Sequence, residues 1–301
     1  MHDLNLNGIF PPVPTPFDSR GNLDLEGLAG NVARYNQAGL VGYIALGSNG
    51  EAVHLTTEES TQVIRTIKNA ATPGRTIVAG VNEFTSRAAI QAIQRASDLG
   101  ADAALVVTPY YYKGAMTQEA LLRHYTAVAD SSPLPVLLYN VPQNTGVVIE
   151  PATIASLSSH ENIVGIKDSA GNMAALADTV RRAIEGFLVM VGNGAIFYPS
   201  LVMGAAGAVL AVACVAPNAC VELYEAVTAN EHTKARELHN RIAPLSQLVT
   251  ANLGVAGLKA AMEIAGFTGG PPRSPLLDVG EPGRQMIRAV MRDTGLFPTV
   301  E

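Results

Sequence analysis

Short apolar runs alternate with amphipathic segments along this chain. The apolar runs are rich in Val, Ile, Leu and Ala, a composition typical of parallel strands that are buried on both faces. They predict eight strands, at Gly8–Pro12, Val41–Leu46, Thr76–Ala79, Ala103–Val107, Val136–Tyr139, Ile163–Lys167, Phe187–Val191 and Ala208–Val212. Each strand except the last two is followed by a clear helical pattern, as at Leu25–Gln37, Thr57–Ala70, Thr85–Asp98, Gln118–Ala129 and Met173–Ile184.

This alternation predicts an α/β fold, a (β/α)8 TIM barrel over residues 1–215. Capping signals support the helix boundaries, because Thr56 and Thr117 place hydroxyl groups just before two helical patterns. A doubly wound open sheet is the alternative, and it would need a glycine-rich turn after the first strand. The chain has the proline-rich segment Pro11–Pro16 there, which cannot cradle a phosphate.

The strand pattern stops after about Val212, and only helical patterns follow. They lie at Cys220–Thr228, Thr233–Val249, Gly254–Ile264 and Pro282–Thr294. Residues 216–301 are therefore predicted to form a C-terminal helical region that packs on the barrel. The glycine- and proline-rich segment Gly269–Pro275 is expected to join two of these helices.

Length and composition agree with a single α/β barrel. The 301 residues match one α/β barrel of about 250 residues with an extension. No apolar stretch of about 20 residues lacks Gly, Pro or polar breaks, so no membrane span is expected. The first residues, Met1–Asn5, lack a basic region followed by an apolar run, and no secretion signal is expected.

Charge and cysteine content bear on the binding partners and on the cellular location. The net charge is −6 and no basic cluster is present, which argues against nucleic acid and against an anionic membrane surface. The two cysteines, Cys214 and Cys220, lie in an apolar segment without metal-ligand spacing. We expect buried free thiols and a reducing cytoplasmic location.

Lys167 is the strongest candidate for chemistry, because it ends a buried strand. In an α/β barrel the carboxyl ends of the strands form the active-site mouth. Burial disfavours the charged form of a lysine and exposes the amine lone pair, which a Schiff base with a carbonyl substrate requires. The alternative is a surface lysine at a strand end. None of the other lysines considered ends a buried strand: Lys68, Lys113, Lys234 and Lys259.

Three more groups follow predicted strands. Tyr139 ends the strand before Lys167, and its phenol could move protons to and from a lysine adduct, although a strand-end tyrosine often only packs. The Gly47–Glu51 turn could bind a carboxylate through its backbone N–H groups, or be an ordinary turn. Tyr110, Tyr111 and Tyr112 could serve an interface, an active site or simple loop packing.

No metal site is predicted. A metal-dependent aldolase would need His and carboxylate ligands at strand ends. The histidines are instead scattered over predicted helices and loops, at positions that include His54, His124, His160, His232 and His239.

These motifs, in this order, resemble the dihydrodipicolinate synthase / N-acetylneuraminate lyase superfamily almost from end to end. The matching segments are Val13–Phe17, Gly47–Glu51, Thr108–Tyr111, Tyr139–Pro142, Gly165–Asp168 and Val191–Gly194. The resemblance implies a barrel with C-terminal helices, a homotetramer built as a dimer of dimers, no metal or other cofactor, and pyruvate chemistry through a lysine imine.

The resemblance also implies roles for individual residues. Lys167 is similar to the imine-forming lysine and Tyr139 to the proton-relay phenol. Ser48 stands where the family often has threonine, and would link Tyr139 to the next tyrosine in the relay. Tyr111 resembles the tyrosine that reaches across a tight dimer into the neighbouring site.

Substrate contacts follow from the same resemblance. The backbone amides of Ser48 and Asn49 resemble the nest for the pyruvate carboxylate, and Val209 matches a residue whose backbone lies near bound pyruvate. Dihydrodipicolinate synthases usually carry an arginine at the position of Asn144, where it grips the carboxylate of aspartate semialdehyde. Asparagine offers neither the charge nor the bidentate fork of a guanidinium.

Asn144 and neighbouring motifs more closely resemble 4-hydroxy-2-oxoglutarate aldolases. The leading hypothesis is therefore a class I Schiff-base aldolase that cleaves 4-hydroxy-2-oxoglutarate, or a related 4-hydroxy-2-oxo acid, to pyruvate and an aldehyde such as glyoxylate. The alternative enzyme is a dihydrodipicolinate synthase that condenses pyruvate with aspartate semialdehyde. A third possibility is a non-catalytic barrel that senses a keto acid, against which the set of Lys167, Tyr139 and Tyr111 argues.

Overall fold

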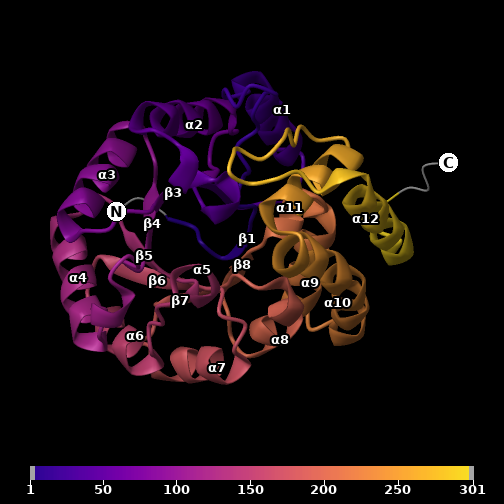
Figure 1. Ribbon diagram of the computed structural model, residues 1–301. Coiled ribbons are helices and arrows are strands. Elements are labelled where there is room, and N and C mark those ends of the chain that lie inside the picture. Colours follow the sequence, from indigo (N-terminus) through magenta and orange to yellow (C-terminus); the bar gives the residue numbers. More distant parts are fainter. Residues whose placement is uncertain (1–3, 298–301) are drawn as a thin grey trace.

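The computed structural model describes residues 4–297, and its centre is a barrel of eight parallel strands (Figure 1). The strands are β1 (Gly8–Phe10), β2 (Gly42–Ala45), β3 (Thr76–Val81), β4 (Ala103–Val107), β5 (Val136–Asn140), β6 (Ile163–Asp168), β7 (Leu188–Val191) and β8 (Gly207–Val209). They pair in the order β1-β8-β7-β6-β5-β4-β3-β2. Main-chain hydrogen bonds between β2 and the chain after β1 close the ring, as from Ile44 N to Pro11 O at 3.1 Å. The predicted (β/α)8 barrel is confirmed.

Helices surround the barrel as an outer ring (Figure 1). They are α1 (Leu25–Tyr35), α2 (Thr57–Ala70), α3 (Ser86–Asp98), α4 (Gln118–Ser131), α6 (Pro151–Ser158), α7 (Met173–Arg182) and α8 (Phe197–Val202). The short helix α5 (Pro142–Thr145), directly after β5, lies inside this ring in Figure 1. The C-terminal helices are α9 (Pro217–Thr228), α10 (His232–Gln247), α11 (Gly254–Ile264) and α12 (Gly280–Thr294). In Figure 1 these four lie together at one side of the ring, coloured orange to yellow.

The predicted helix starts are held by the expected caps. The Thr56 hydroxyl accepts a hydrogen bond from Glu59 N, and the Glu59 carboxylate accepts one from Thr56 N. This reciprocal capping box satisfies two N–H groups that would otherwise lack partners. The Thr117 hydroxyl accepts from Ala120 N at the start of α4 in the same manner.

Several boundaries differ from the predicted ones. β1 ends at Phe10 because Pro11 and Pro12 have no N–H to donate to a ladder. β8 ends at Val209, where the chain turns into a short 3₁₀ helix, η5 (Ala211–Cys214). Helix α10 gives way after Gln247 to a π-helical turn, η6 (Leu248–Asn252), rather than continuing to Val249.

A helix also follows each of the last two strands, although the sequence pattern did not assign these two helices to the barrel. Helix α8 follows β7, and α9 follows β8 and contacts both α8 and β1. The division into regions 1–215 and 216–301 stays a prediction, and the outermost residues of those regions, 1–3 and 298–301, lie outside the described residues.

The apolar core has two layers. The larger layer lies between the sheet and the helices. The smaller one fills the interior of the barrel and includes Phe10, Leu105, Met190, Val209 and Tyr139. Since side chains alternate between the two faces of a strand, each strand supplies both layers. The interior is therefore packed, and polar chemistry is confined to its rim.

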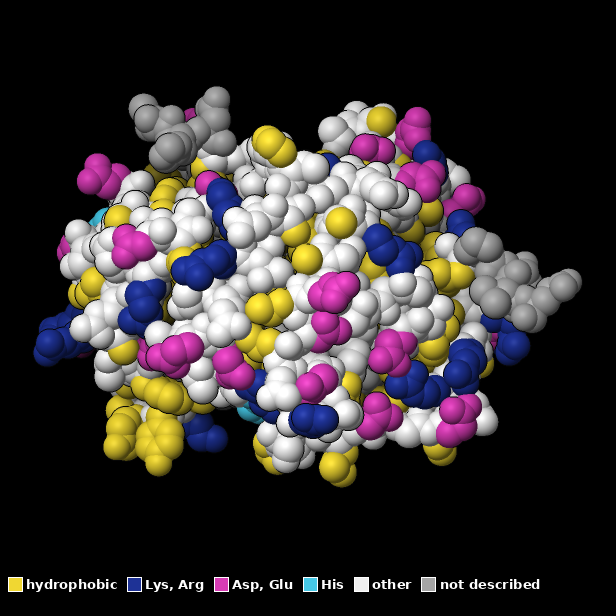
Figure 2. All heavy atoms as spheres, turned by 90° about the horizontal axis from the view of Figure 1, so that it is seen from above, with side chains coloured by type: hydrophobic (Ala, Val, Ile, Leu, Met, Phe, Trp, Pro, Cys, Tyr) yellow, Lys and Arg dark blue, Asp and Glu magenta, His cyan; other side chains and the backbone are white. Residues whose placement is uncertain are grey.

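Other expectations from composition can be compared with the described residues. Cys214 and Cys220 are buried free thiols, as predicted. Within residues 4–297 no helix is both long enough and apolar enough to cross a membrane. On the face seen in Figure 2, Lys and Arg side chains are interspersed with Asp and Glu, and no single-sign patch dominates that view.

A substitution at Gly80, in β3, would test how tightly the barrel packs against the turn after β2. A Cβ on Gly80 would lie 2.2 Å from Leu46 O, whereas a Cβ on Gly30, an exposed position of α1, would have nothing within 4 Å. We expect Gly80→Ala to lower the free energy of unfolding by roughly 1–3 kcal/mol through overpacking. The matched control Gly30→Ala should raise it by about 0.5–1 kcal/mol, because alanine favours a helix interior. Equal denaturation midpoints for the two variants would contradict this account.

Candidate active site

Lys167 and Tyr139 lie side by side at the carboxyl ends of β6 and β5. The register of the two parallel strands pairs their Cα atoms directly. Lys167 is only 3% exposed and Tyr139 only 4% exposed. The Lys167 Nζ lies 4.1 Å from the centroid of the Tyr139 ring. The alternative of a surface lysine is therefore wrong, and the amine is desolvated against an aromatic face.

Three polar neighbours surround the Tyr139 hydroxyl. The Tyr139 oxygen lies 3.3 Å from Ser48 Oγ. Burial alone would raise the pKa of Tyr139, but the charge of Lys167 and hydrogen bonds with Ser48, Lys167 and Ser169 outweigh it and lower the pKa. A phenol whose pKa is lowered releases a proton more readily, which suits a group that must donate and take back protons.

The Ser48 side chain comes from a 3₁₀ turn, η1 (Ser48–Gly50), directly after β2. Gly50 N donates to Gly47 O at 2.9 Å, which closes the turn. The first N–H groups of a helical turn have no partner within it. Among residues 4–297, no hydrogen bond uses the N–H of Ser48 or of Asn49. These two amides are thus available to an anion such as a carboxylate.

A second polar pair joins the ends of β5 and β6. Asn140 Nδ2 donates to Asp168 Oδ2 at 2.9 Å, and Asp168 Oδ1 accepts from Ala170 N at 2.8 Å. Burial raises the pKa of Asp168, and these hydrogen bonds act in the opposite direction. The pair fixes the two strand ends that carry Tyr139 and Lys167. It was not predicted, although both residues directly follow the two candidates in the sequence.

Gly192 provides the room that Lys167 needs. A Cβ at Gly192 would lie 3.0 Å from Lys167 Cε and 2.0 Å from Ser169 Oγ. Any side chain here would displace the amine, so the position requires glycine. The sequence offered one signal, a glycine directly after the seventh strand, but no role was predicted for it.

The remaining predicted residues are not all brought to this centre. Val209 is buried in the same interior layer as Tyr139. Asn144 is exposed on α5. Tyr111 is 72% exposed, and its ring packs edge to face against that of Phe84, with the two ring centroids 6.1 Å apart. Within this protomer no hydrogen bond joins Tyr111 to Ser48 or Tyr139 in the part of the chain described.

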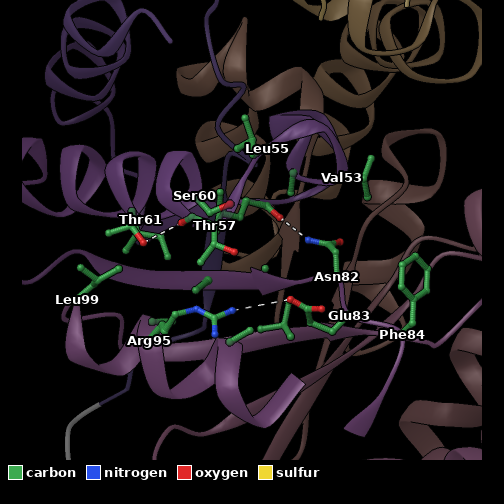
Figure 3. A pocket seen from close by; sticks show the side chains of 18 of the residues that line it. Val53, Leu55, Thr57, Ser60, Thr61, Asn82, Glu83, Phe84, Arg95 and Leu99 are labelled. Carbon is green, nitrogen blue, oxygen red and sulfur yellow. Dashed lines mark hydrogen bonds and ion pairs between the residues drawn. The ribbon is translucent and has the colours of Figure 1, made fainter. Parts of the chain in front are cut away.

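A separate cavity of about 320 Å³ lies between α2 and α3 (Figure 3). Thr57, Thr61, Asn82 and Arg95 are among its walls, and an ion pair of 4.0 Å joins Arg95 to Glu83 across one side. Neither Lys167 nor Tyr139 lines it. Among the described residues, no cluster of His, Cys, Asp and Glu could hold a metal ion.

A buried lysine against a buried tyrosine at the carboxyl rim of a barrel is the arrangement expected of an enzyme that acts through a lysine imine. The Dihydrodipicolinate synthetase family model matches residues 5–294, and the chain belongs to that family. It is therefore a class I, pyruvate-dependent carbon–carbon lyase.

Individual relatives agree with this assignment. A 4-hydroxy-tetrahydrodipicolinate synthase from Methanothrix thermoacetophila is 36% identical over 94% of this chain and 95% of its own. A solved dihydrodipicolinate synthase from Bacillus anthracis superposes with a TM-score of 0.92 at 30% identity, covering 98% of this chain and 99% of the other. A solved dihydrodipicolinate synthase from Acinetobacter baumannii, complexed with pyruvate, superposes with a TM-score of 0.90 at 34% identity, covering 97% of this chain and 100% of the other.

These comparisons confirm the superfamily that the motifs suggested. They do not support the finer prediction that the chain is nearest to 4-hydroxy-2-oxoglutarate aldolases, because the relatives carry the synthase name. The synthase, stated above as the alternative, is favoured by them. The discrepancy arises because the prediction relied on a few loop residues such as Asn144, whereas the comparisons span the whole chain.

Proposed function

We propose that this protein condenses pyruvate with aspartate semialdehyde, the reaction of a 4-hydroxy-tetrahydrodipicolinate synthase, through an imine at Lys167. The observation that carries the proposal is the desolvated Lys167 amine, 4.1 Å from the Tyr139 ring centroid, in a chain of this family. Support for pyruvate comes from the relative that was solved with pyruvate bound. Support for the second substrate comes from the names of the relatives.

In the proposed mechanism the Lys167 amine attacks the C2 carbonyl carbon of pyruvate and forms a carbinolamine. Tyr139 donates a proton to the departing hydroxyl group, so that water leaves and the imine forms. The Tyr139 phenolate left by that transfer takes a proton from the pyruvate methyl group and gives an enamine. The enamine carbon attacks the aldehyde carbon of the second substrate, and the aldehyde oxygen takes up that proton. The amine of the second substrate then attacks the imine carbon, which closes the ring and releases the Lys167 amine. The amides of Ser48 and Asn49 hold the pyruvate carboxylate throughout.

The imine gives the first prediction. Incubation with pyruvate and borohydride should reduce the imine to a stable adduct, which peptide mass spectrometry should locate on Lys167. Lys167→Ala should form no adduct and show no turnover. Tyr139→Phe should keep the fold but lose roughly 10²–10⁴-fold in turnover, the usual range for a positioned acid–base group.

An adduct on another lysine would move the reaction to a different site. Absence of any adduct from folded wild-type protein would refute the imine itself. An adduct without turnover, for every aldehyde tried, would instead favour the keto-acid sensor.

The residues around the second substrate depart from the usual pattern of the family, because Asn144 stands where an arginine usually binds its carboxylate. A cation nevertheless lies beside that turn. A Cβ on Gly146, which caps α5, would lie 3.2 Å from Lys113 Cδ and 3.8 Å from Lys113 Nζ. We infer that the Lys113 ammonium replaces the missing guanidinium for the carboxylate of aspartate semialdehyde. Asn144 itself favours the second candidate function, cleavage of 4-hydroxy-2-oxoglutarate.

Steady-state kinetics separate these candidates. We expect kcat/KM for aspartate semialdehyde to exceed kcat/KM for cleavage of 4-hydroxy-2-oxoglutarate. Lys113→Met should lower the first value by roughly ten- to a hundred-fold, since a charged hydrogen bond contributes about 1.5–3 kcal/mol. Adding Asn144→Arg to Lys113→Met should restore it. Pyruvate adduct formation, which needs neither side chain, serves as the control.

The opposite ratio of the two kcat/KM values would assign the protein to the aldolases while leaving the imine mechanism intact. Unchanged kinetics in Lys113→Met would show that another group binds the second carboxylate.

We propose further that the enzyme assembles as a homotetramer, a dimer of dimers, in which Tyr111 completes the neighbour's site. Tyr111 and Tyr112 are 72% and 75% exposed, and Phe84, which Tyr111 contacts, is 51% exposed. Such aromatic groups are enriched at interfaces. In this arrangement the proton relay would run from Tyr139 through Ser48 to the partner's tyrosine.

Subunit mixing tests this arrangement. Lys167→Ala and Tyr111→Phe proteins, each inactive or nearly so alone, should regain activity when their subunits exchange. If Tyr111 acts across the interface, one site of each hybrid dimer carries both wild-type residues. Proven hybrids without recovered activity would place Tyr111 in its own subunit's site.

A further inference from the structure

A buried ion pair lies behind the turn that carries Ser48 and Asn49. Lys259 Nζ, from α11, is 2.5 Å from Glu51 Oε1, and each side chain is only 1% exposed. The same ammonium donates to Pro271 O at 3.0 Å and lies 4.3 Å from the centroid of the Phe17 ring. Lysine and glutamate are almost never fully buried unless they are paired, because desolvation of a charge is costly.

Glu51 makes further contacts that anchor it from several sides. Its Oε2 accepts a hydrogen bond from Arg273 N at 2.9 Å and lies 3.2 Å from His54 Nδ1. The backbone of Glu51 is left-handed, with φ of 53°, although glutamate gains nothing from that conformation. A non-glycine residue in this region is strained and persists only where its surroundings hold it.

Glu51 is joined directly to the candidate site. Glu51 N donates to Ser48 O at 3.1 Å, and this bond closes the turn whose Ser48 hydroxyl lies 3.3 Å from the Tyr139 hydroxyl. On the opposite side, the Thr15 hydroxyl donates to Gly50 O at 2.7 Å. The turn is thus clamped, and a displacement of Glu51 would move both Ser48 and the two free amides.

The loop after α11 closes tightly over the ion pair. A Cβ on Gly269 would lie 2.2 Å from Lys259 O, and one on Gly270 would lie 2.4 Å from Phe17 O. Only glycine at these two positions allows the loop to approach so closely. The loop in turn delivers Pro271 O to Lys259 and Arg273 N to Glu51.

We propose that Lys259 and Glu51 are positioning residues: their ion pair lets the C-terminal helical region hold the Ser48–Asn49 amides in the orientation that binds the pyruvate carboxylate. This inference rests on the proposed function. Stability alone is a poor explanation for the pair, because apolar side chains of similar size often replace a buried ion pair without loss of stability. The hydrogen bond from Arg273 N and the contact with Lys259 Nζ are directional, so they can hold the Glu51 end of the turn in one orientation.

The test measures pyruvate binding separately from the second substrate. Lys259→Met removes the ammonium group and keeps an unbranched side chain that is one atom shorter, so the Glu51 carboxylate is left without its cation. We expect the half-saturating pyruvate concentration for borohydride-trapped adduct formation to rise about ten-fold or more, which corresponds to roughly 1.4 kcal/mol. The adduct should still form on Lys167 at saturating pyruvate. Lys234→Met is the matched control, because it breaks an ion pair with Glu222 whose side chains are both 49% exposed.

Glu51→Asp provides a milder second variant, since it keeps both charges but withdraws the carboxylate by one methylene group. It should also raise the half-saturating pyruvate concentration. Wild-type pyruvate dependence in folded Lys259→Met and Glu51→Asp would overturn the proposal. Failure of both variants to fold would overturn it as well, because the pair would then be a requirement for stability. The absence of a pyruvate adduct in the wild-type protein would refute the proposed function instead.

Discussion

Burial of the Lys167 amine against the Tyr139 ring is the interaction on which the rest of the site depends. A lysine that is 3% exposed has lost most of its hydration, and the face of the phenol ring compensates only part of that loss. The register of β5 with β6 brings the two side chains together, and the Asn140–Asp168 hydrogen bond fixes the ends of both strands. The pairing of the two strands therefore sets the position of the buried amine.

The site has an outer support that comes from the other end of the chain. At one end of the turn after β2, the Ser48 hydroxyl lies beside the Tyr139 hydroxyl. At the other end, Lys259 Nζ and the backbone N–H of Arg273 hold the Glu51 carboxylate. One turn thus joins the barrel rim to the C-terminal helices. This connection gives the C-terminal region a part in the geometry of the site in addition to its packing role.

Close packing of neighbouring atoms against glycine Cα atoms is a recurring constraint around this rim. Gly80 allows the backbone at Leu46 to approach β3, Gly192 leaves space for the Lys167 side chain, and Gly269 lets a loop lie on α11. Each of these glycines lies where a Cβ would meet an atom within about 3 Å. The rim is consequently less tolerant of added volume than its exposure to substrate would suggest.

The sequence by itself determined the fold class, the strand that carries Lys167 and the strand that carries Tyr139. It could do so because the apolar runs and helical periods are local, and because position at a strand end fixes which rim a side chain joins. The family also followed from motifs that lie in short segments. The choice between synthase and aldolase did not follow from these motifs. Asn144 shows only that the usual arginine is missing, and it does not indicate that Lys113, on another loop, lies beside the same turn.

Only the tertiary structure decided which charged residues act together. In the sequence, Lys259 is a lysine within a late helical pattern, and Glu51 is a glutamate that follows a glycine-rich turn. Nothing in either local pattern predicts that the two side chains form an ion pair. The fold buries both side chains to 1% exposure and sets them 2.5 Å apart. Contacts between residues distant in the chain depend on how helices pack on the barrel, and packing is a property of the whole folded chain rather than of any segment.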